Sequence, residues 1–409
     1  MTRRQIPDRR RQRPLVLMSP LSLTVAVGLG LTGCSSPHGP PTPGPPPAGW
    51  STVALPLMPK ATTTSLYAAA LADNTGWAVG TSSDGGVFKA TAEHWNGRQW
   101  STVPAANPKP TGNDLYGVAA LSDKDAWAVG AGAGGADAAG SNTTLNNDTT
   151  LIEHWDGTQW RALEPPQVPA LTTYESVLRG VSAVSADDVW AVGFGDAALI
   201  EHWDGARWSV SPTPDLHSDK NGSSLSGVAS ASATDVWAVG ANSVAGRQVC
   251  LLEHWDGATW SSVACPLPAG AGDAKLSAVT ALSPTDVWAV GFYMTGQTET
   301  TKDSHGLIEH FDGTTWSVVP SPHLTTGSRP PGGFSDDLVG VAARSPDDVY
   351  AVGGSRLVHW DGKSWTVEPY QAAGATLEAI AAPPRGTLWA VGERLTGSTL
   401  APIAVAQTQ

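Results

Sequence analysis

All 18 tryptophans of this 409-residue chain fall on three positions of one repeated motif. The first position, in W-A-V-G, is occupied by Trp77, Trp127, Trp190, Trp237, Trp288 and Trp389, with Tyr350 replacing it once. The second follows a histidine at Trp95, Trp155, Trp203, Trp255 and Trp360, with Phe311 replacing it once. The third comes five residues later at Trp100, Trp160, Trp208, Trp260, Trp316 and Trp365, and Trp50 stands alone near the N-terminus. Self-similarity at a period of roughly 40–60 residues predicts a propeller or a solenoid.

Each repeat contains four segments that are typical of β-strands. The first is L-x-G-V-x-A, as at residues 115–120, and a turn S-x-x-D joins it to the W-A-V-G segment. The third is L-I-E-H-W, and an Asn-Gly or Asp-Gly pair joins it to the fourth, W-S-V-V, which is the strongest short-range hairpin signal. No segment has convincing helical periodicity. The sequence therefore predicts an all-β, seven-bladed β-propeller of four-stranded antiparallel blades.

The two ends of the repeat array are complementary. The seventh unit, 377–405, stops without a fourth strand, whereas residues 49–53 resemble a fourth strand without the other three. We expect the N-terminal strand to complete the last blade, because closing the ring leaves no free sheet edge there. The propeller domain is then predicted to span residues 50–409.

The first 34 residues form a separate unit. Six arginines precede an apolar stretch at 15–33, which ends in L-T-G-C with Cys34 as its last residue. This stretch resembles a bacterial lipoprotein signal peptide, which implies lipidation of Cys34 and an extracytoplasmic protein anchored in the cell envelope. A simple secretory signal and an uncleaved membrane anchor are the alternatives, and both the general secretory and the twin-arginine export routes stay open. Residues 35–49, rich in Pro and Gly, are expected to be a semi-rigid tether.

Charge and cysteine content limit the partners. Removing the six arginines and Asp8 leaves 18 basic and 36 acidic residues, a net charge of −18. Such a protein repels phosphate backbones, so we expect no nucleic-acid partner, and membrane contact only through the lipid. We expect a monomer without a cofactor. Cys250 and Cys265 flank one predicted hairpin and are a candidate disulfide in an exported protein, with two buried free thiols as the alternative.

The repeated aromatic and polar positions are interpreted as structural. Tryptophans in the same strand register of every blade should face neighbouring blades and form the core between them. The motif histidines each lie in a different blade, so they cannot share an ion, whose ligands lie within about 2 Å of it. We expect each to bind a turn backbone or a carboxylate: His94, His154, His202, His254, His310 and His359. The aspartates of S-x-x-D are interpreted as turn-fixing side chains, no metal site is predicted, and His217, His305 and His323 are expected in irregular segments.

One strand position varies while its neighbours do not: the residue after the leading Leu of the first strand. Around the ring it is Tyr67, Tyr116, Arg179, Ser226, Ser277, Val339 and Glu378. Because the first strand is innermost, these side chains are predicted to ring the channel mouth as a polar and stacking pocket, the alternative being a water-filled channel that tolerates any residue. Variable connections such as 131–150, 292–306 and 320–336 share that face, which is typical of a binding face or of tolerated loops. Further candidates from this face are Phe194, Phe292, Tyr293, His305, Arg356 and Arg394.

The motif H-W-D-G-x-x-W, as at 154–160, resembles the short propeller repeats of bacterial surface proteins, of the Asp-box and kelch types. An Asp-box has one residue between its Asp and Gly, whereas this motif has none. Sialidases that carry Asp-boxes also use an arginine cluster, a nucleophilic tyrosine with a glutamate partner and an acid aspartate, and that set cannot be placed here. The resemblance implies the propeller and leaves the ligand unnamed.

No nucleophile–base motif, metal-spacing cluster or phosphate loop occurs, so no catalytic residue is assigned. The sequence favours a lipid-anchored, non-enzymatic binding module that presents its loop face to an envelope protein or glycan. A glycan-active hydrolase or lyase of the sialidase-like propeller type is an alternative, with Asp196, Asp303, Asp336 or Glu378 as candidate acids. A structural or assembly scaffold is a third.

Overall fold

The computed structural model describes residues 49–56, 61–110, 112–133, 148–166, 176–214, 222–296, 303–322, 336–383, 385–397 and 399–408. In these residues there are 28 strands, arranged in seven four-stranded antiparallel sheets. The predicted signal peptide, Cys34 and the tether up to residue 48 lie outside the described residues, as do His217 and His323. None of the described segments is a helix that could cross a membrane.

The first four blades follow the chain order. Blade 1 comprises β2 (Thr63–Ala72), β3 (Thr75–Asp84), β4 (Val87–Trp95) and β5 (Trp100–Val103). Blade 2 comprises β6 (Asn113–Ser122), β7 (Asp125–Ala133), β8 (Asp148–Trp155) and β9 (Trp160–Leu163). Blade 3 comprises β10 (Val177–Ser185), β11 (Asp188–Phe194), β12 (Ala198–Trp203) and β13 (Trp208–Ser211). Blade 4 comprises β14 (Ser223–Ser232), β15 (Asp235–Val244), β16 (Arg247–Trp255) and β17 (Trp260–Val263).

The last three blades continue around the ring, and one of them joins both ends of the domain. Blade 5 comprises β18 (Ala274–Ser283), β19 (Asp286–Thr295), β20 (Asp303–Phe311) and β21 (Trp316–Val318). Blade 6 comprises β22 (Gly340–Ser345), β23 (Asp348–Gly353), β24 (Arg356–Trp360) and β25 (Trp365–Val367). Blade 7 comprises β26 (Ala375–Ala381), β27 (Trp389–Thr396), β28 (Thr399–Thr408) and β1 (Gly49–Val53).

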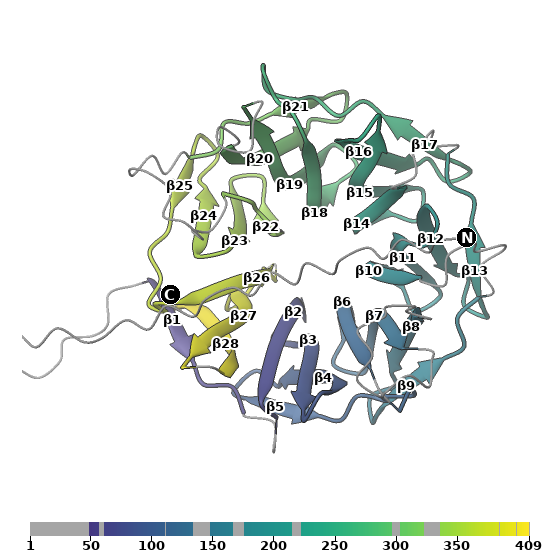
Figure 1. Cartoon of the computed structure of the whole chain (residues 1–409), viewed down its shortest axis with the longest axis vertical. Coiled ribbons are helices and arrows are strands. Elements are labelled where there is room, and N and C mark those ends of the chain that lie inside the picture. Colours follow the sequence, from purple (N-terminus) through teal and green to yellow (C-terminus); the bar gives the residue numbers. More distant parts are fainter. Residues whose placement is uncertain are drawn as a thin grey trace, which may run out of the picture. The chain divides into compact units, whose positions relative to one another are not determined.

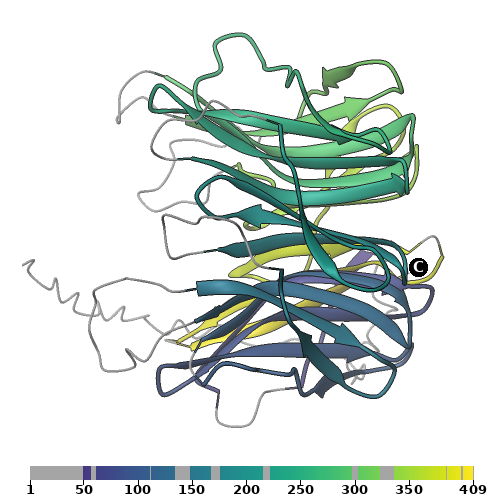
Figure 2. The same ribbon diagram turned by 90° about the vertical axis from the view of Figure 1, so that its right-hand side faces the viewer.

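The seven sheets form a ring, with the first strand of each blade innermost (Figure 1). Viewed from the side, the strands of successive blades are stacked around the ring, and their turns lie at its two faces (Figure 2). The ring closes as predicted: β1 pairs antiparallel with β28, from Gly49 opposite Thr408 to Val53 opposite Ala404. The predicted fold class, including the N-terminal closing strand, is therefore confirmed.

The tryptophans form the core between blades. The ring of Trp77 in blade 1 lies 4.8 Å from those of both Trp155 and Trp160 in blade 2. The same packing of one W-A-V-G ring against two rings of the next blade recurs at Trp127, Trp190, Trp237, Trp288 and Trp389. Packed aromatic pairs each add about 0.5–1.5 kcal/mol beyond their buried area. The structural interpretation of these positions is confirmed.

The interface between blades 6 and 7 departs from this pattern in a compensated way. Tyr350 replaces the W-A-V-G tryptophan, and Gln407 of β28 stands opposite Trp50, where five other blades carry a second tryptophan and blade 5 carries Phe311. The Gln407 Nε2 amide donates a hydrogen bond to the Tyr350 hydroxyl at 3.1 Å, and the Trp50 ring packs edge-on against Tyr350 at 5.8 Å. Two departures from the repeat therefore satisfy each other.

Four of the six motif histidines bind carboxylates, as expected, whereas among the described residues His94 Nε2 has no hydrogen-bond partner and His254 Nε2 lies 3.5 Å from Asp235. His202 Nε2 lies 2.8 Å from Asp188 Oδ1, and its ring stacks on Trp190 at 4.0 Å. The same pairing with the S-x-x-D aspartate occurs at His154, His310 and His359. The interpretation of these aspartates as turn-fixing is wrong, because the turn amides bind the serine instead: Asp187 N donates to Ser185 Oγ at 3.3 Å. The aspartate carboxylate reaches the imidazole on the neighbouring strand.

Glycine occupies the fourth position of W-A-V-G for a steric reason. A Cβ built on Gly193 would lie 1.9 Å from the backbone oxygen of Val177 on the neighbouring innermost strand. The equivalent glycines of the other six blades meet the same backbone at 1.8–2.0 Å: Gly80, Gly130, Gly240, Gly291, Gly353 and Gly392. The motif keeps glycine here because the first two strands of each blade approach too closely for any side chain.

Five glutamates of the E-H-W triplet are fully buried, a feature that the sequence analysis did not single out: Glu93, Glu153, Glu201, Glu253 and Glu309. Glu153 accepts a hydrogen bond at 3.0 Å from the backbone N–H of Ala106, which lies in the connection leaving blade 1. Glu93 instead accepts one from Thr102 Oγ1 at 2.8 Å. Burial raises the pKa of Glu93 to about 7 and that of Glu201 to about 8. Burial therefore raises the pKa of all five carboxyl groups and favours their neutral form.

Candidate binding site at the axial channel

A cavity of about 160 Å³ lies on the axis of the ring. Three consecutive residues from the innermost strand region of every blade line it, beginning with Tyr67, Tyr116, Arg179, Ser226, Ser277, Val339 and Glu378. These are the seven positions at which the sequence varies between repeats. The structure thus brings the predicted ring of side chains together around one axial cavity.

A β-bulge places these side chains. In blade 3 the register of β10 with β11 shifts between Leu178 and Gly180, so Arg179 is left out of the ladder. Leu178 is fully buried between blades, whereas Arg179 lies on the cavity. The same shift follows the leading leucine in blades 1, 2, 4, 5 and 7. An extra, unpaired residue re-aims its side chain, which explains why this position varies while its neighbours do not.

Aromatic and cationic groups are contiguous on one side of the cavity. The rings of Tyr67 and Tyr116 lie 5.6 Å apart, and the Arg179 guanidinium lies 4.4 Å from the centre of the Tyr116 ring. The same guanidinium lies 5.6 Å from the ring of Phe194, the last residue of β11. Among the described residues Arg179 forms no salt bridge. Cation–π contacts of this kind hold the guanidinium in place and leave its N–H donors available to a ligand.

Three carboxyl groups, Glu378, Glu393 and Asp114, lie near this stack, and Glu378 alone is part of the cavity lining. Burial, and then the neighbouring Glu393 carboxylate, raise the pKa of Glu378 to about 6. The hydroxyl of Ser65 donates a hydrogen bond to Glu393. Burial raises the pKa of Asp114, and Arg179 opposes that rise. The channel therefore presents a cationic and aromatic arc beside one carboxyl group, that of Glu378.

Six predicted candidates do not line the cavity. Phe194 contacts Arg179 from outside it, and Phe292 lies opposite Lys275 in the β18–β19 ladder. The His305 ring stacks on Tyr293 with a centroid distance of 5.0 Å, and His305 lies in β20. The prediction that His305 lies in an irregular segment is therefore wrong, because β19 and β20 both extend further than the sequence indicated. The other two candidates outside the cavity are Arg356 and Arg394.

These arginines differ in their surroundings. Arg356 forms a salt bridge with Asp336, which engages its guanidinium outside the cavity. Arg394 lies in β27 opposite Ala375 and Ala401 and is exposed. Of the predicted ligand-binding residues, the structure therefore brings together Tyr67, Tyr116, Arg179 and Glu378, with Phe194 adjacent.

Sequence reasoning missed the charged groups just outside the lining. Asp114 and Lys275 occupy the position before the leading leucine, and Glu393 follows the W-A-V-G motif of blade 7. Burial, and then the Arg179 charge, lower the pKa of Lys275. The position before the leucine also varies between repeats, and that signal could have identified Asp114 and Lys275.

The cavity lining supports non-covalent binding. Among its residues Glu378 is the single carboxylate, and no histidine or cysteine contributes to the lining. Phenol hydroxyls, a guanidinium and stacked rings suit a ligand with a planar or anionic group. Among the lining residues no nucleophile is paired with a histidine base.

No known family model matches this chain, and no curated protein matches its sequence. Its structure is similar to that of YCF48 bound to D1 peptide, with a TM-score of 0.54 and 15% identity over 90% of this chain and 97% of that one. YCF48 from Cyanidioschyzon merolae gives a TM-score of 0.53 and 16% identity, covering 88% of this chain and 99% of that one.

A xyloglucanase of the GH74 family from Xanthomonas campestris is also similar, with a TM-score of 0.52 and 16% identity over 86% of this chain. This chain spans about half (54%) of that enzyme. At these identities the similarities establish the propeller fold and nothing finer.

Proposed function

We propose that this protein is a non-enzymatic binding module that holds a peptide segment of a cell-envelope protein at the mouth of its axial channel. The observation that carries the proposal is the continuous stack of Tyr67, Tyr116, Arg179 and Phe194. Tyr and Arg are the residues most enriched where binding energy concentrates in protein interfaces. The similarity of the fold to YCF48, a protein whose structure holds a D1 peptide, supports a peptide ligand.

The size of the cavity favours a peptide over an oligosaccharide. Its volume of about 160 Å³ lies below the roughly 300–1,000 Å³ of sites that enclose a small molecule. Such a space accepts one side chain or a chain terminus while the rest of a partner lies across the face. A ligand carboxylate would receive the Arg179 N–H donors, and an aromatic side chain would extend the tyrosine stack.

We also propose that the propeller is anchored as a lipoprotein. The basic segment, the apolar stretch and the position of Cys34 support cleavage before Cys34 and its lipidation. The Asp-box-like and kelch-like form of the repeats, typical of bacterial surface proteins, supports the same location. Mass spectrometry of the protein purified from its membrane should find a lipid on Cys34, and an unmodified or absent Cys34 would contradict the anchor.

Site-specific photo-crosslinking tests the binding site. A benzophenone amino acid at Phe194 places the probe beside Arg179, and the same probe at Ala186 places it in blade 3 at the opposite end of β11. In cells we expect protein adducts from position 194 and not from 186, and Arg179→Ala should reduce the adducts at least about tenfold, as for an interface hot spot. Equal adducts from both positions, or adducts unaffected by Arg179→Ala, would discard the channel mouth as the site.

A glycan hydrolase is the second candidate, favoured by one observation. Glu378, with its pKa raised to about 6 beside Glu393, has the acidity of a general acid. The fold similarity to a xyloglucanase adds support. Release of sugars from envelope polysaccharides by the purified propeller, abolished in Glu378→Gln, would replace the binding module with an enzyme. If neither a peptide nor a glycan depends on these residues, a scaffold role remains.

A further inference from the structure

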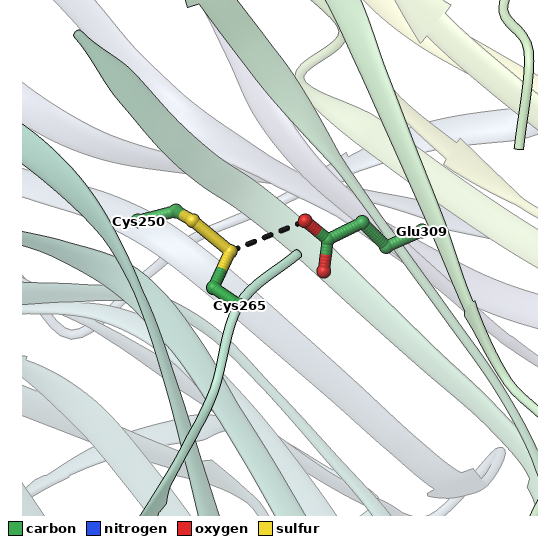
Figure 3. A group of neighbouring side chains, drawn as sticks. All are labelled: Cys250, Cys265 and Glu309. Carbon is green, nitrogen blue, oxygen red and sulfur yellow. Dashed lines mark hydrogen bonds between the residues drawn. A yellow bond between two sulfur atoms is a disulfide. The ribbon is translucent and has the colours of Figure 1, made fainter. Parts of the chain in front are cut away.

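A sulfur and carboxylate cluster lies away from the channel, between blades 4 and 5. Cys250 in β16 and Cys265, two residues beyond β17, are joined by a disulfide, with their Cα atoms 6.2 Å apart. Glu309 of β20 reaches this disulfide from the next blade, and its carboxyl group points at the sulfur atoms (Figure 3). Three groups that are metal ligands in many proteins therefore meet at one blade interface.

Glu309 contacts the disulfide and lacks the backbone partners that Glu153 has in blade 2. It is fully buried, and its Oε1 lies 3.1 Å from Cys265 Sγ. Because a disulfide sulfur carries no hydrogen, this contact is a hydrogen bond only when the Glu309 carboxyl is protonated and donates to the sulfur. Its Oε2 has no hydrogen-bond partner among the described residues. The equivalent Glu153, by contrast, accepts hydrogen bonds from the backbone N–H groups of Ala106 and Asn107.

The spacing of the ligand atoms suits a metal ion. One oxygen of Glu309 and the two Sγ atoms all lie within 4.8 Å of one another. Zn²⁺ takes sulfur at about 2.3 Å and carboxylate oxygen at about 2.0–2.2 Å, so ligand atoms on opposite sides of the ion are at most about 4.5 Å apart. The two sulfur atoms are bonded to each other here, so they must move apart after S–S cleavage before both can bind one ion.

We propose that reduction of the Cys250–Cys265 disulfide converts this cluster into a Zn²⁺ site with two thiolates and the Glu309 carboxylate as ligands. A dithiol reductant supplies two electrons and two protons to the S–S bond, becoming a disulfide itself and leaving two thiols. Zn²⁺ then binds as both thiols and the carboxyl release their protons to solvent, and water completes a tetrahedral set.

The site would change what holds the blades together. In the oxidised form the covalent link stays within blade 4 and the connection that follows it. In the zinc form the ion also ties that connection to β20 of blade 5, so the metal joins two blades. No metal site was predicted from the sequence. The candidate ligands considered there were the repeated histidines, which lie in separate blades, and not the cluster of Cys250, Cys265 and Glu309.

Cobalt titration of the mature chain tests the proposal. The protein is reduced with a phosphine, which binds the metal weakly, and Co²⁺ is added as a spectroscopic probe for the zinc site. We expect a sulfur-to-cobalt charge-transfer band that saturates at one ion per chain, is absent from the oxidised protein and disappears on addition of Zn²⁺. Glu309→Gln should weaken Co²⁺ binding at least about tenfold, since loss of even an outer-shell partner costs that much.

The matched control is Glu201→Gln, the equivalent buried glutamate of blade 3, which should leave Co²⁺ affinity unchanged. Absence of the band from the reduced protein, or equal affinity in Glu309→Gln and the unaltered protein, would overturn the proposal. Circular dichroism follows the fold throughout. If reduction unfolds the ring, recovery of the folded signal with Zn²⁺ supports the site, and failure of Zn²⁺ to restore it refutes the site.

Discussion

The buried glutamates make the stability of the propeller depend on pH, and Glu253 shows the effect most clearly. It is fully buried, and neither of its carboxylate oxygens has a hydrogen-bond partner among the described residues. Burial alone raises its pKa from 4.5 to about 7. The perturbation is Glu253→Gln, which keeps the shape of the side chain and cannot ionise.

The sign follows from proton binding. Between pH 4.5 and 7 the folded chain keeps this proton while the unfolded chain has lost it, so the free energy of unfolding falls as pH rises through this window. The contribution is fully present below pH 4.5 and is lost above pH 7. At about 1.4 kcal/mol for each pH unit, the loss between pH 5 and pH 8 is about 2–3 kcal/mol from this one group.

Urea unfolding at pH 5 and at pH 8, followed by tryptophan fluorescence, measures the effect. Relative to the unaltered protein, Glu253→Gln should gain about 2–3 kcal/mol between the two pH values. Glu164→Gln, which alters an exposed glutamate just after β9, is the matched control and should show no such gain. If the Glu253→Gln difference is the same at both pH values, or larger at pH 5, then Glu253 is not a neutral buried acid and the reasoning fails.

Three further predictions, tested with four substitutions, concern the ring itself. Trp50→Ala empties the closing interface, where this ring is 3% exposed, and should lower the free energy of unfolding by about 3–5 kcal/mol; an unchanged melting temperature would contradict closure by β1. Gly240→Ala places a Cβ 2.0 Å from a backbone oxygen and should prevent accumulation of folded protein. Gly246→Ala is the control: its Cβ has no heavy atom within 4 Å, so it should cost only about 1 kcal/mol of left-handed backbone strain. Equal yields of folded protein from Gly240→Ala and Gly246→Ala would refute the steric account. Asp188→Ala leaves His202 Nε2 without its acceptor and should lower the free energy of unfolding by about 1–2 kcal/mol, as measured by chemical denaturation. No change in that free energy would mean that the pair is only a surface contact.

The periodic pattern alone was enough to predict the ring. The W-A-V-G glycine recurs seven times, and the tryptophan of that motif and the Asn-Gly or Asp-Gly turn recur six times each. An isolated fourth strand at the start matches a missing one at the end. Each signal is local or depends on simple alternation along a strand, so it can be read without knowing which segments meet. The variable position after the leading leucine likewise predicted Tyr67, Tyr116, Arg179 and Glu378 on the channel.

Other features depend on which blades become neighbours and on where the chain leaves its regular ladder. The bulge that turns Arg179 into the channel is an irregularity of strand pairing, which residue periodicity does not reveal. The burial of Glu253 depends on how the blades pack, and the contact of Glu309 with Cys265 depends on the connection from the preceding blade. These residues belong to the same repeat as their partnered equivalents, so their sequence context is nearly identical. Their chemistry differs because the tertiary structure determines which donors, sulfur atoms or charges surround each carboxyl group.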